Sequence, residues 1–300
     1  MPDLTIAEAL KPPPSLPRLD REVLLSHAIG RDRVFLMAYG ETKLTLAQLR
    51  RYRAFIARAM KHEPVAYITG TREFYGRDFF VGPGVLIPRP ETELLVDIAI
   101  KKISEHAHAK KKCAVIDVGT GTGAIIESVF LSLGSSVVRK NISWFAVDSE
   151  AAALRSARKN AKHQQISTIR FLKSDLLARL SKRLTSYDEL FVLANLPYLS
   201  DTIYRSAAPN VKRYEPKSAL VSGKDGLDHY RRLVAELRAI NRAGARVNFF
   251  LEISPEQAKK LPALFADITT LSSLEIVPDL AGKSRLVIGV IEKTQNKSSA

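Results

Sequence analysis

The stretch that decides the fold is Cys113-Ala-Val-Ile-Asp117-Val-Gly119-Thr-Gly121-Thr-Gly123. Its first six residues are apolar or β-branched apart from Asp117, which is typical of a buried strand. Glycines at alternate positions then allow a tight turn and a close approach of the backbone to a ligand. A helical pattern follows at once, so free N–H groups and a positive dipole end would face that ligand. The stretch predicts a strand, a ligand-binding turn and a helix.

Short apolar or β-branched runs recur after this turn and alternate with helical patterns. The expected strands are Cys113–Val118, Trp144–Asp148, Thr168–Ser174, Leu190–Asn195, Ala245–Ile253 and Ser284–Glu292. The helical stretches are Thr122–Leu133, Glu150–His163 and Asp225–Asn241. This alternation predicts an α/β fold with a mainly parallel sheet that helices cover on both faces. Ligands of such sheets bind outside the carboxyl ends of the strands.

The N-terminal part of the chain has helical periodicity instead. Asp20 is a candidate N-cap of a first helix that would end at Gly30, and Thr45 is a candidate cap of a second helix. Residues 73–87 alternate aromatic and β-branched side chains around Gly76, which predicts a short β-hairpin.

These patterns divide the chain into four parts. We expect a helical domain at residues 1–72, a hairpin linker at 73–90 and the larger α/β domain at 91–292. Residues 293–300 have low complexity and are expected to be a disordered tail.

Composition excludes several classes of protein. The 300 residues contain a single cysteine, which excludes a domain built on intramolecular disulfides and favours a reducing cytosol. No apolar run approaches the ~20 residues of a membrane span, no secretory signal is visible, and no cluster of residues has the spacing of metal ligands. The formal net charge of +15 favours acidic partners such as nucleic acid, although a basic surface also serves solubility. We expect a cytoplasmic monomer without a metal.

Acidic residues follow two more of the expected strands. Asp148 could accept hydrogen bonds from both hydroxyls of a ribose, or could cap the helix that begins beside it. Asp175 could accept from the amino group of an adenine, and Leu176 could cover the ring; a helix cap is again the alternative. Together with the glycine turn, these residues favour a nucleoside site.

The fourth strand ends in Asn195-Leu196-Pro197-Tyr198, the most informative tetrapeptide of the chain. An amino or amide nitrogen on a planar group is a poor nucleophile because its lone pair is delocalised. The Asn195 side-chain oxygen and the Pro197 carbonyl could each accept one N–H, favour a pyramidal nitrogen and aim its lone pair at an electrophile. Leu196 would stiffen the turn, and Tyr198 would offer a flat apolar face to the substrate.

These motifs resemble those of class I methyltransferases that use S-adenosylmethionine (SAM). The glycine turn is similar to their motif I, and the tetrapeptide is similar to their [DNS]-[PL]-P-[YFW] motif for planar nitrogens. That motif alone leaves glutamine and adenine open as acceptors, and the leucine at 196 is typical of rRNA adenine dimethyltransferases.

Three flanking segments favour glutamine. They are Pro64–Gly70 with Glu73–Gly76, Leu86–Glu93 (LIPRPETE), and Glu215–Tyr230 (EPKSALVSGKDGLDHY). With the order of the motifs, they resemble the HemK/PrmC family of release factor glutamine methyltransferases over residues 18–292. The resemblance implies a Rossmann-like, seven-stranded sheet with a small N-terminal helical domain. It also implies methylation of the GGQ glutamine of class I peptide chain release factors, with S-adenosylhomocysteine as the second product.

Carried over residue by residue, the resemblance assigns a site. The cofactor ligands would be Asp117, Gly119, Thr120, Gly121, Thr122, Gly123, Asp148, Asp175, Leu176 and Asn195. The substrate residues would be Asn195, Leu196, Pro197 and Tyr198, of which Asn195, Pro197 and Tyr198 would be catalytic.

The chain departs from the family pattern at a few positions. Leu176 stands where many members have an aromatic residue, Leu196 where they have proline, and Glu127 where they tend to be apolar. Two alternatives therefore stay open. One is a nucleic-acid adenine-N6 methyltransferase, which the formal net charge of +15 also favours. The other is a SAM-fold binding protein without activity. Arg89, between two prolines, is expected to orient the linker, while Trp144 and Cys113 are expected to be strand core.

Overall fold

The computed structural model describes residues 4–11, 15–106, 111–133 and 142–294. Its contacts divide the chain into two compact units. The first comprises the described residues up to Thr71 together with Val81–Pro83 and Ala208–Glu215. The second comprises Arg72–Phe80, Gly84–Ala207 and the described residues from Pro216 onward. The predicted tail falls almost entirely on residues 295–300, outside the described residues.

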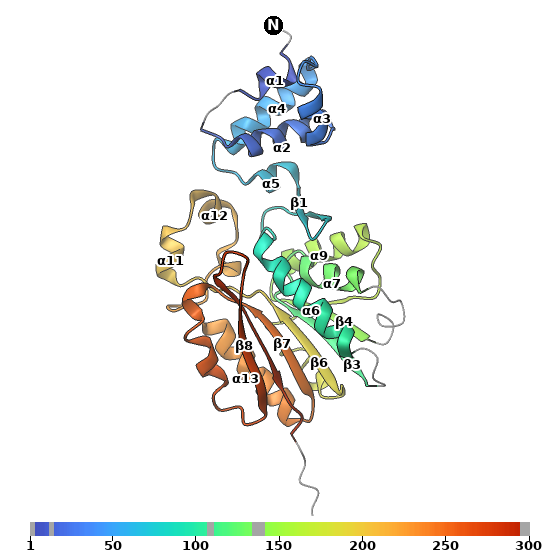
Figure 1. Ribbon diagram of the computed structural model, residues 1–300, viewed down its shortest axis with the longest axis vertical. Helices are drawn as coiled ribbons and strands as arrows, with labels where there is room; N and C mark the ends of the chain where they lie inside the picture. The colour runs from blue at the N-terminus through green and yellow to red at the C-terminus, as the bar shows by residue number, and fades with distance from the viewer. Residues whose placement is uncertain (1–3, 12–14, 107–110, 134–141, 295–300) are drawn as a thin grey trace, which may run out of the picture. The chain divides into compact units, whose positions relative to one another are not determined.

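The first unit is helical (Figure 1). Its helices are α1 (Ile6–Ala9), α2 (Arg18–Ile29), α3 (Arg33–Ala38), α4 (Leu46–Ala59), α5 (Val65–Thr69) and α12 (Pro209–Tyr214). As predicted, Gly30 ends α2 in the left-handed conformation and Thr45 caps α4, in a capping box with Gln48. The prediction for Asp20 is wrong, because α2 begins at Arg18 and places Asp20 in its first turn. Leu24, Leu25 and Tyr52 lie in the core of this unit.

The predicted hairpin is present. Strands β1 (Thr71–Phe74) and β2 (Arg77–Phe80) pair, and the turn residues Tyr75 and Gly76 both have positive φ. Asn160 fixes the hairpin beside the glycine turn. Its Oδ1 accepts from the Phe80 backbone N–H at 2.7 Å, and its Nδ2 donates to the Thr122 carbonyl at 2.9 Å.

A seven-stranded sheet of order β5-β4-β3-β6-β7-β9-β8 forms the centre of the second unit. The strands are β3 (Cys113–Val118), β4 (Ile142–Asp148), β5 (Arg170–Lys173), β6 (Glu189–Ala194), β7 (Arg246–Glu252), β8 (Leu271–Pro278) and β9 (Ser284–Ile291). The first five strands are parallel, and β9 runs antiparallel to both β7 and β8. The predicted Rossmann-like sheet of seven strands is confirmed.

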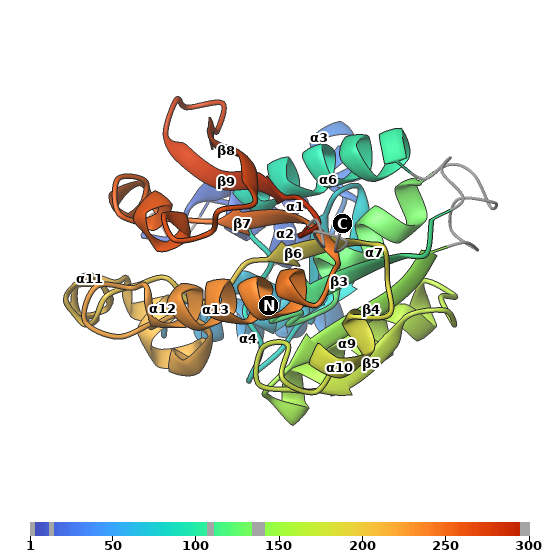
Figure 2. The same cartoon turned by 90° about the horizontal axis from the view of Figure 1, so that it is seen from below.

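Helices cover both faces of the sheet, and Figure 2 shows α6 (Glu93–His106) and α13 (Asp228–Arg242) on opposite sides of it. Buried residues of α6, α7 (Ala124–Ser132) and α9 (Ala151–His163) pack on one face, around Trp144 and Cys113. Both of these side chains are strand core, as predicted.

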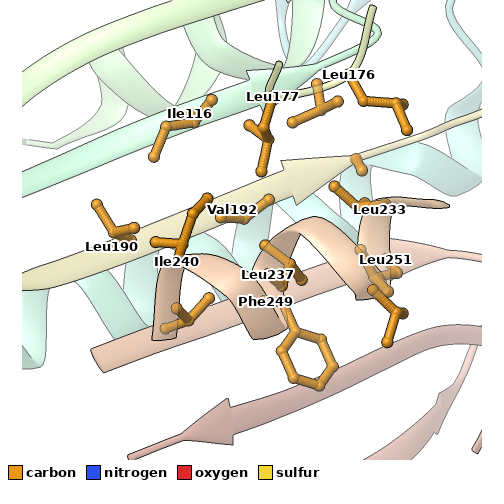
Figure 3. Close-up of a cluster of buried hydrophobic side chains, with 14 of the residues drawn as sticks. Ile116, Leu176, Leu177, Leu190, Val192, Leu233, Leu237, Ile240, Phe249 and Leu251 are labelled. Atoms are coloured by element: carbon orange, nitrogen blue, oxygen red, sulfur yellow. The ribbon is translucent and has the colours of Figure 1, made fainter. Parts of the chain in front are cut away.

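The other face packs against α13. Leu233, Leu237 and Ile240 of α13 point toward Val192 of β6 and Phe249 of β7 (Figure 3). This apolar layer fixes the parallel strands, and therefore fixes the loops that leave their carboxyl ends.

The described residues of this unit also form shorter elements. They are η1 (Pro90–Thr92), α10 (Ser181–Leu184), α11 (Asp201–Ser206), η2 (Lys217–Ala219), η3 (Pro255–Gln257) and η4 (Leu261–Phe265).

Candidate active site

A pocket opens at the carboxyl ends of β3, β4, β5 and β6, where the parallel fold places ligands. It brings together ten of the predicted site residues: Gly119, Thr120, Gly121, Thr122, Asp148, Asp175, Leu176, Asn195, Leu196 and Pro197. Residues of the segments 84–92 and 216–219 line the same pocket.

The glycine turn needs its glycines. Gly119, Gly121 and Gly123 have φ of 74°, 56° and 85°, a region that other residues rarely adopt. A Cβ on Gly119 would lie 2.9 Å from Leu196 Cδ2, so the turn packs closely on the Asn195–Tyr198 segment. A side chain at 119 would therefore displace both halves of the site.

Asp117 supports this turn from behind and does not line the pocket. It is fully buried, and its Oδ2 accepts a 2.6 Å hydrogen bond from the Thr120 hydroxyl, while Oδ1 has no partner. Burial raises the pKa of Asp117 to about 7.

Glu127, on α7 beneath the turn, is also buried and has no hydrogen-bond partner on either carboxyl oxygen. Burial, together with the neighbouring Asp117, raises the pKa of Glu127 to about 9. The Glu127 carboxyl is therefore neutral in the folded protein near pH 7.

Asp148 joins the turn to the second strand. Its Oδ2 accepts from the Gly121 backbone N–H and its Oδ1 from the Glu150 N–H, both at 2.9 Å. Glu150, and not Asp148, is the N-cap of α9. Each carboxylate oxygen retains acceptor capacity toward the pocket, because each can accept two hydrogen bonds.

Asp175 and Leu176 lie at the end of the third strand. The Asp175 carboxylate is largely exposed and forms a 2.5 Å ion pair with Arg232 of α13. Leu176 is buried and has a φ of 47°, an uncommon conformation for leucine. Both residues line the pocket, and their adenine-binding roles stay predictions.

Asn195 has the most informative environment. Its Nδ2 donates a 3.1 Å hydrogen bond to the Thr92 hydroxyl, whereas its Oδ1 is buried and has no partner. A buried acceptor without a partner is costly, typically ~1–3 kcal/mol. Such an atom on the wall of a pocket is suited to accept a hydrogen bond from a ligand.

Tyr198 lies elsewhere. It does not belong to the lining of this pocket; its side chain packs, partly buried, against the α13 side of the core. Burial raises the pKa of Tyr198 to about 12. Its predicted contact with substrate stays a prediction, and its visible role is in packing.

Thr92 and His229 contribute to the site without having been singled out by sequence. Thr92 belongs to the LIPRPETE segment, but its contact with Asn195 joins residues 103 positions apart. The His229 ring lines the pocket, and its Nδ1 lies 2.7 Å from the Ser222 hydroxyl. Burial lowers the pKa of His229, which favours the neutral ring.

The described ranges contain neither a cluster of potential metal ligands nor a helix that could span a membrane. No group of three or more His, Cys, Asp or Glu residues there is arranged to hold a metal ion. None of the described helices has the length and apolarity that a membrane crossing requires.

Comparison with known proteins identifies two matching families. Residues 8–70 match the PrmC N-terminal domain, and residues 109–216 match a methyltransferase domain. A release factor glutamine methyltransferase of Bacillus anthracis is 35% identical, covering 90% of this chain and 92% of the relative. The one from Koribacter versatilis is 36% identical over 91% of each chain.

A solved structure supports the fold alone. The hMettl16 catalytic domain, in complex with an RNA hairpin, aligns with a TM-score of 0.50 at 14% identity, covering 82% of this chain and 95% of that one.

Proposed function

This chain belongs to the release factor glutamine methyltransferase family, and we propose that it methylates the glutamine of the GGQ motif in class I peptide chain release factors. The methyl donor in this proposal is SAM, and the acceptor is the side-chain amide nitrogen of the glutamine. The single observation that carries the proposal is the buried Oδ1 of Asn195, which has no partner and lies in the lining of the pocket.

The residues present fit SAM. The glycine turn leaves space for close approach, since a Cβ on Gly121 would meet no atom within 4 Å. Asp148 would accept from the ribose hydroxyls, Asp175 and Leu176 would flank the adenine, and Asn195 would lie at the reacting end. When bound, SAM supplies an electrophilic sulfonium methyl group.

Asn195 and Pro197 would prepare the acceptor nitrogen. Oδ1 of Asn195 would accept a hydrogen bond from one amide N–H, and the Pro197 carbonyl would accept one from the other. Both contacts would weaken the delocalisation of the nitrogen lone pair and aim this lone pair at the methyl group. This is positioning and preorganised electrostatics, and it requires no charged base. The Thr92 contact holds the Asn195 amide with its oxygen free for this purpose.

We further propose that the first unit recognises the body of the release factor. Helix α4 carries exposed Arg50 and Arg53, whose charge suits an acidic partner surface. A second point of attachment would offset the entropy lost when a flexible GGQ loop becomes ordered. Such an enzyme of translation is expected to work in the cytoplasm.

The test is a transfer assay with labelled SAM in three reactions. The first contains a release factor, the second contains rRNA and the third contains no acceptor. The proposal predicts label in the release factor only. Label in rRNA would instead support the adenine-N6 alternative, and binding of SAM without transfer to either acceptor would support a binding protein.

A further inference from the structure

His229 lies on the wall of the pocket, and one face of α13 places it there. Two contacts dock this helix against the segment that follows β5. Arg232 forms the 2.5 Å ion pair with Asp175, and the Glu236 carboxylate accepts from the Leu177 backbone N–H at 2.8 Å. Positions three or four apart share one face of a helix, so His229 is the next member of this row. The row therefore brings His229 to the part of the pocket that Asp175 lines.

Ser222 fixes the orientation of the imidazole ring. It is 1% exposed, and its Oγ accepts from the His229 backbone N–H at 3.0 Å and lies 2.7 Å from Nδ1 of the ring. One hydroxyl thus holds both the backbone and the side chain of His229. Nε2, on the opposite side of the ring, has no hydrogen-bond partner within the described residues and is not enclosed by protein.

Counting protons assigns the tautomer of this ring. A serine hydroxyl has one proton to donate. If Ser222 donates this proton to Nδ1, the neutral ring carries its own proton on Nε2. If Nδ1 donated instead, the buried Ser222 proton would find no acceptor among the described residues, which is costly. The first arrangement leaves no proton of the pair unsatisfied, and it makes Nε2–H a free donor.

The charges around His229 favour the neutral ring. Burial lowers the pKa of His229, and Arg232 acts in the same direction. Asp175 and Asp228 act in the opposite direction without overcoming the other two effects. Above neutral pH the ring is therefore uncharged and has a single N–H to donate.

A donor and an acceptor thus belong to the same part of the pocket. Oδ2 of Asp175 is held by Arg232, and Oδ1 has no partner in the chain as far as the structure describes it. Leu176 adds an apolar wall beside them. An adenine has the complementary pattern, because its amino group is a donor and the ring nitrogens on either side of it, N1 and N7, are acceptors.

We propose that His229 is a cofactor-binding residue: its Nε2–H donates to a ring nitrogen beside the adenine amino group of SAM, while Asp175 accepts from that amino group. The inference deepens the proposed function and rests on it for the identity of the cofactor. The pair would also select adenine over a purine that carries a carbonyl at the same position, since that oxygen would meet the Asp175 carboxylate.

The first measurement needs no ligand. Nitrogen-15 NMR at pH 8 distinguishes the protonated nitrogen of an imidazole from the unprotonated one, and the loss of signals in His229→Phe identifies those of His229. The proposal predicts a proton on Nε2 in the wild type and a mixture of tautomers in Ser222→Ala, which lacks the hydroxyl. A wild-type ring with its proton on Nδ1 would overturn the proposal.

The second measurement is calorimetry with S-adenosylhomocysteine and with its 1-deaza and 7-deaza analogues, in which one ring nitrogen is replaced by carbon. In the wild type one analogue should bind roughly tenfold more weakly than S-adenosylhomocysteine, the scale of one hydrogen bond. His229→Phe should bind S-adenosylhomocysteine roughly tenfold more weakly than the wild type and lose this preference. His229→Gln, which keeps an N–H donor, should retain part of it.

Two results would contradict the role of His229. A preference for S-adenosylhomocysteine that His229→Phe leaves unchanged would mean that another group contacts the ring nitrogen. An equal loss of affinity for all three ligands in His229→Phe would mean that the imidazole serves only the packing of the wall.

His163→Phe is the matched control. His163 is an exposed residue in the last turn of α9, outside the lining of the pocket, and its ring lies edge to face with Phe80. The variant should keep the wild-type affinities for all three ligands. A wild type that binds S-adenosylhomocysteine without methylating a release factor would overturn the proposed function, and the analogues would still decide on His229. A wild type that binds none of the ligands would overturn both proposals.

Discussion

At the scale of the residue, the proposed chemistry depends on one acceptor atom. Oδ1 of Asn195 is buried and has no hydrogen-bond partner in the folded protein. Folding has therefore already removed water from this atom and fixed its orientation, so neither change is needed during the reaction. A hydrogen-bond acceptor prepared in this way stabilises the geometry of the reacting nitrogen more than it stabilises bound SAM. Loss of the atom should therefore affect the chemical step selectively.

Asn195→Ala should lower kcat by about 10²–10³, the usual cost of removing one preorganised hydrogen-bonding group. The affinity for SAM, measured by calorimetry, should change little. Asn195→Asp keeps an acceptor and adds a charge, and serves as the conservative comparison. A variant Asn195→Ala that methylates a release factor at the wild-type rate would remove the proposed role of the clamp.

Asp148→Ala should weaken SAM binding by roughly 1.5–3 kcal/mol, the range for hydrogen bonds to a charged group. The substitution removes acceptors for the ribose and also releases the Gly121 N–H. Asp148→Asn, which retains one oxygen, should lose less. Titration calorimetry that gives the same SAM affinity for wild type and Asp148→Ala would show that Asp148 serves only the turn.

At the scale of the element, α7 contains a buried carboxyl that should make the free energy of unfolding depend on pH. Glu127 is buried without a partner, and its folded pKa of about 9 lies above the unfolded value. Between these two values the folded state holds a proton that the unfolded state has released. The free energy of unfolding therefore falls as the pH rises through this window.

Glu127→Leu should remove this dependence and stabilise the protein by roughly 1–3 kcal/mol at pH 8, the cost of an unsatisfied buried polar group. The advantage should shrink toward pH 5, because the unfolded state begins to bind the same proton as the pH nears its Glu127 pKa of about 4.5. Denaturant unfolding at the two pH values measures it. A variant that is less stable than the wild type at pH 8 would contradict this prediction. It would mean that the Glu127 carboxyl has a stabilising partner in the folded protein.

The strands that could be predicted from sequence were those with a clear hydrophobic pattern. β3, β6 and β7 read as continuous apolar runs because both faces of each strand are covered by helices. β8 was not predicted. It lies at the edge of the sheet, most of its residues are exposed, and register shifts at Leu271/Ser273 and Val277/Pro278 interrupt any alternation.

The site followed the same logic. Residues at the ends of strands, such as Asp148 and Asn195, could be placed from sequence because parallel topology gathers these ends. Thr92 could not be placed as the partner of Asn195, because their contact depends on packing between segments 103 residues apart. Sequence also offered no signal that Tyr198 would pack, partly buried, against the core and stand outside the lining of the pocket.

At the scale of the whole molecule, the two units are expected to divide the work between affinity and chemistry. Arg50→Glu with Arg53→Glu, on α4, should raise KM for the intact release factor and weaken the salt dependence of binding. SAM affinity and the rate on a short GGQ peptide should stay nearly unchanged. Steady-state kinetics at two salt concentrations measure the difference.

Lys162→Glu with Arg242→Glu is the matched control, since it makes the same change in net charge at exposed positions of α9 and α13. If both double variants raise KM equally, only the total charge matters. If neither does, the first unit has no part in recognition through this basic helix.

The most direct measurement of the central claim is mass spectrometry of a release factor after incubation with the enzyme and SAM. The account predicts one added methyl group, located by fragmentation on the side chain of the GGQ glutamine, in the wild type and far less in Asn195→Ala. An unmodified glutamine after incubation with an enzyme that binds SAM, or a methyl group located on any other residue, would contradict it.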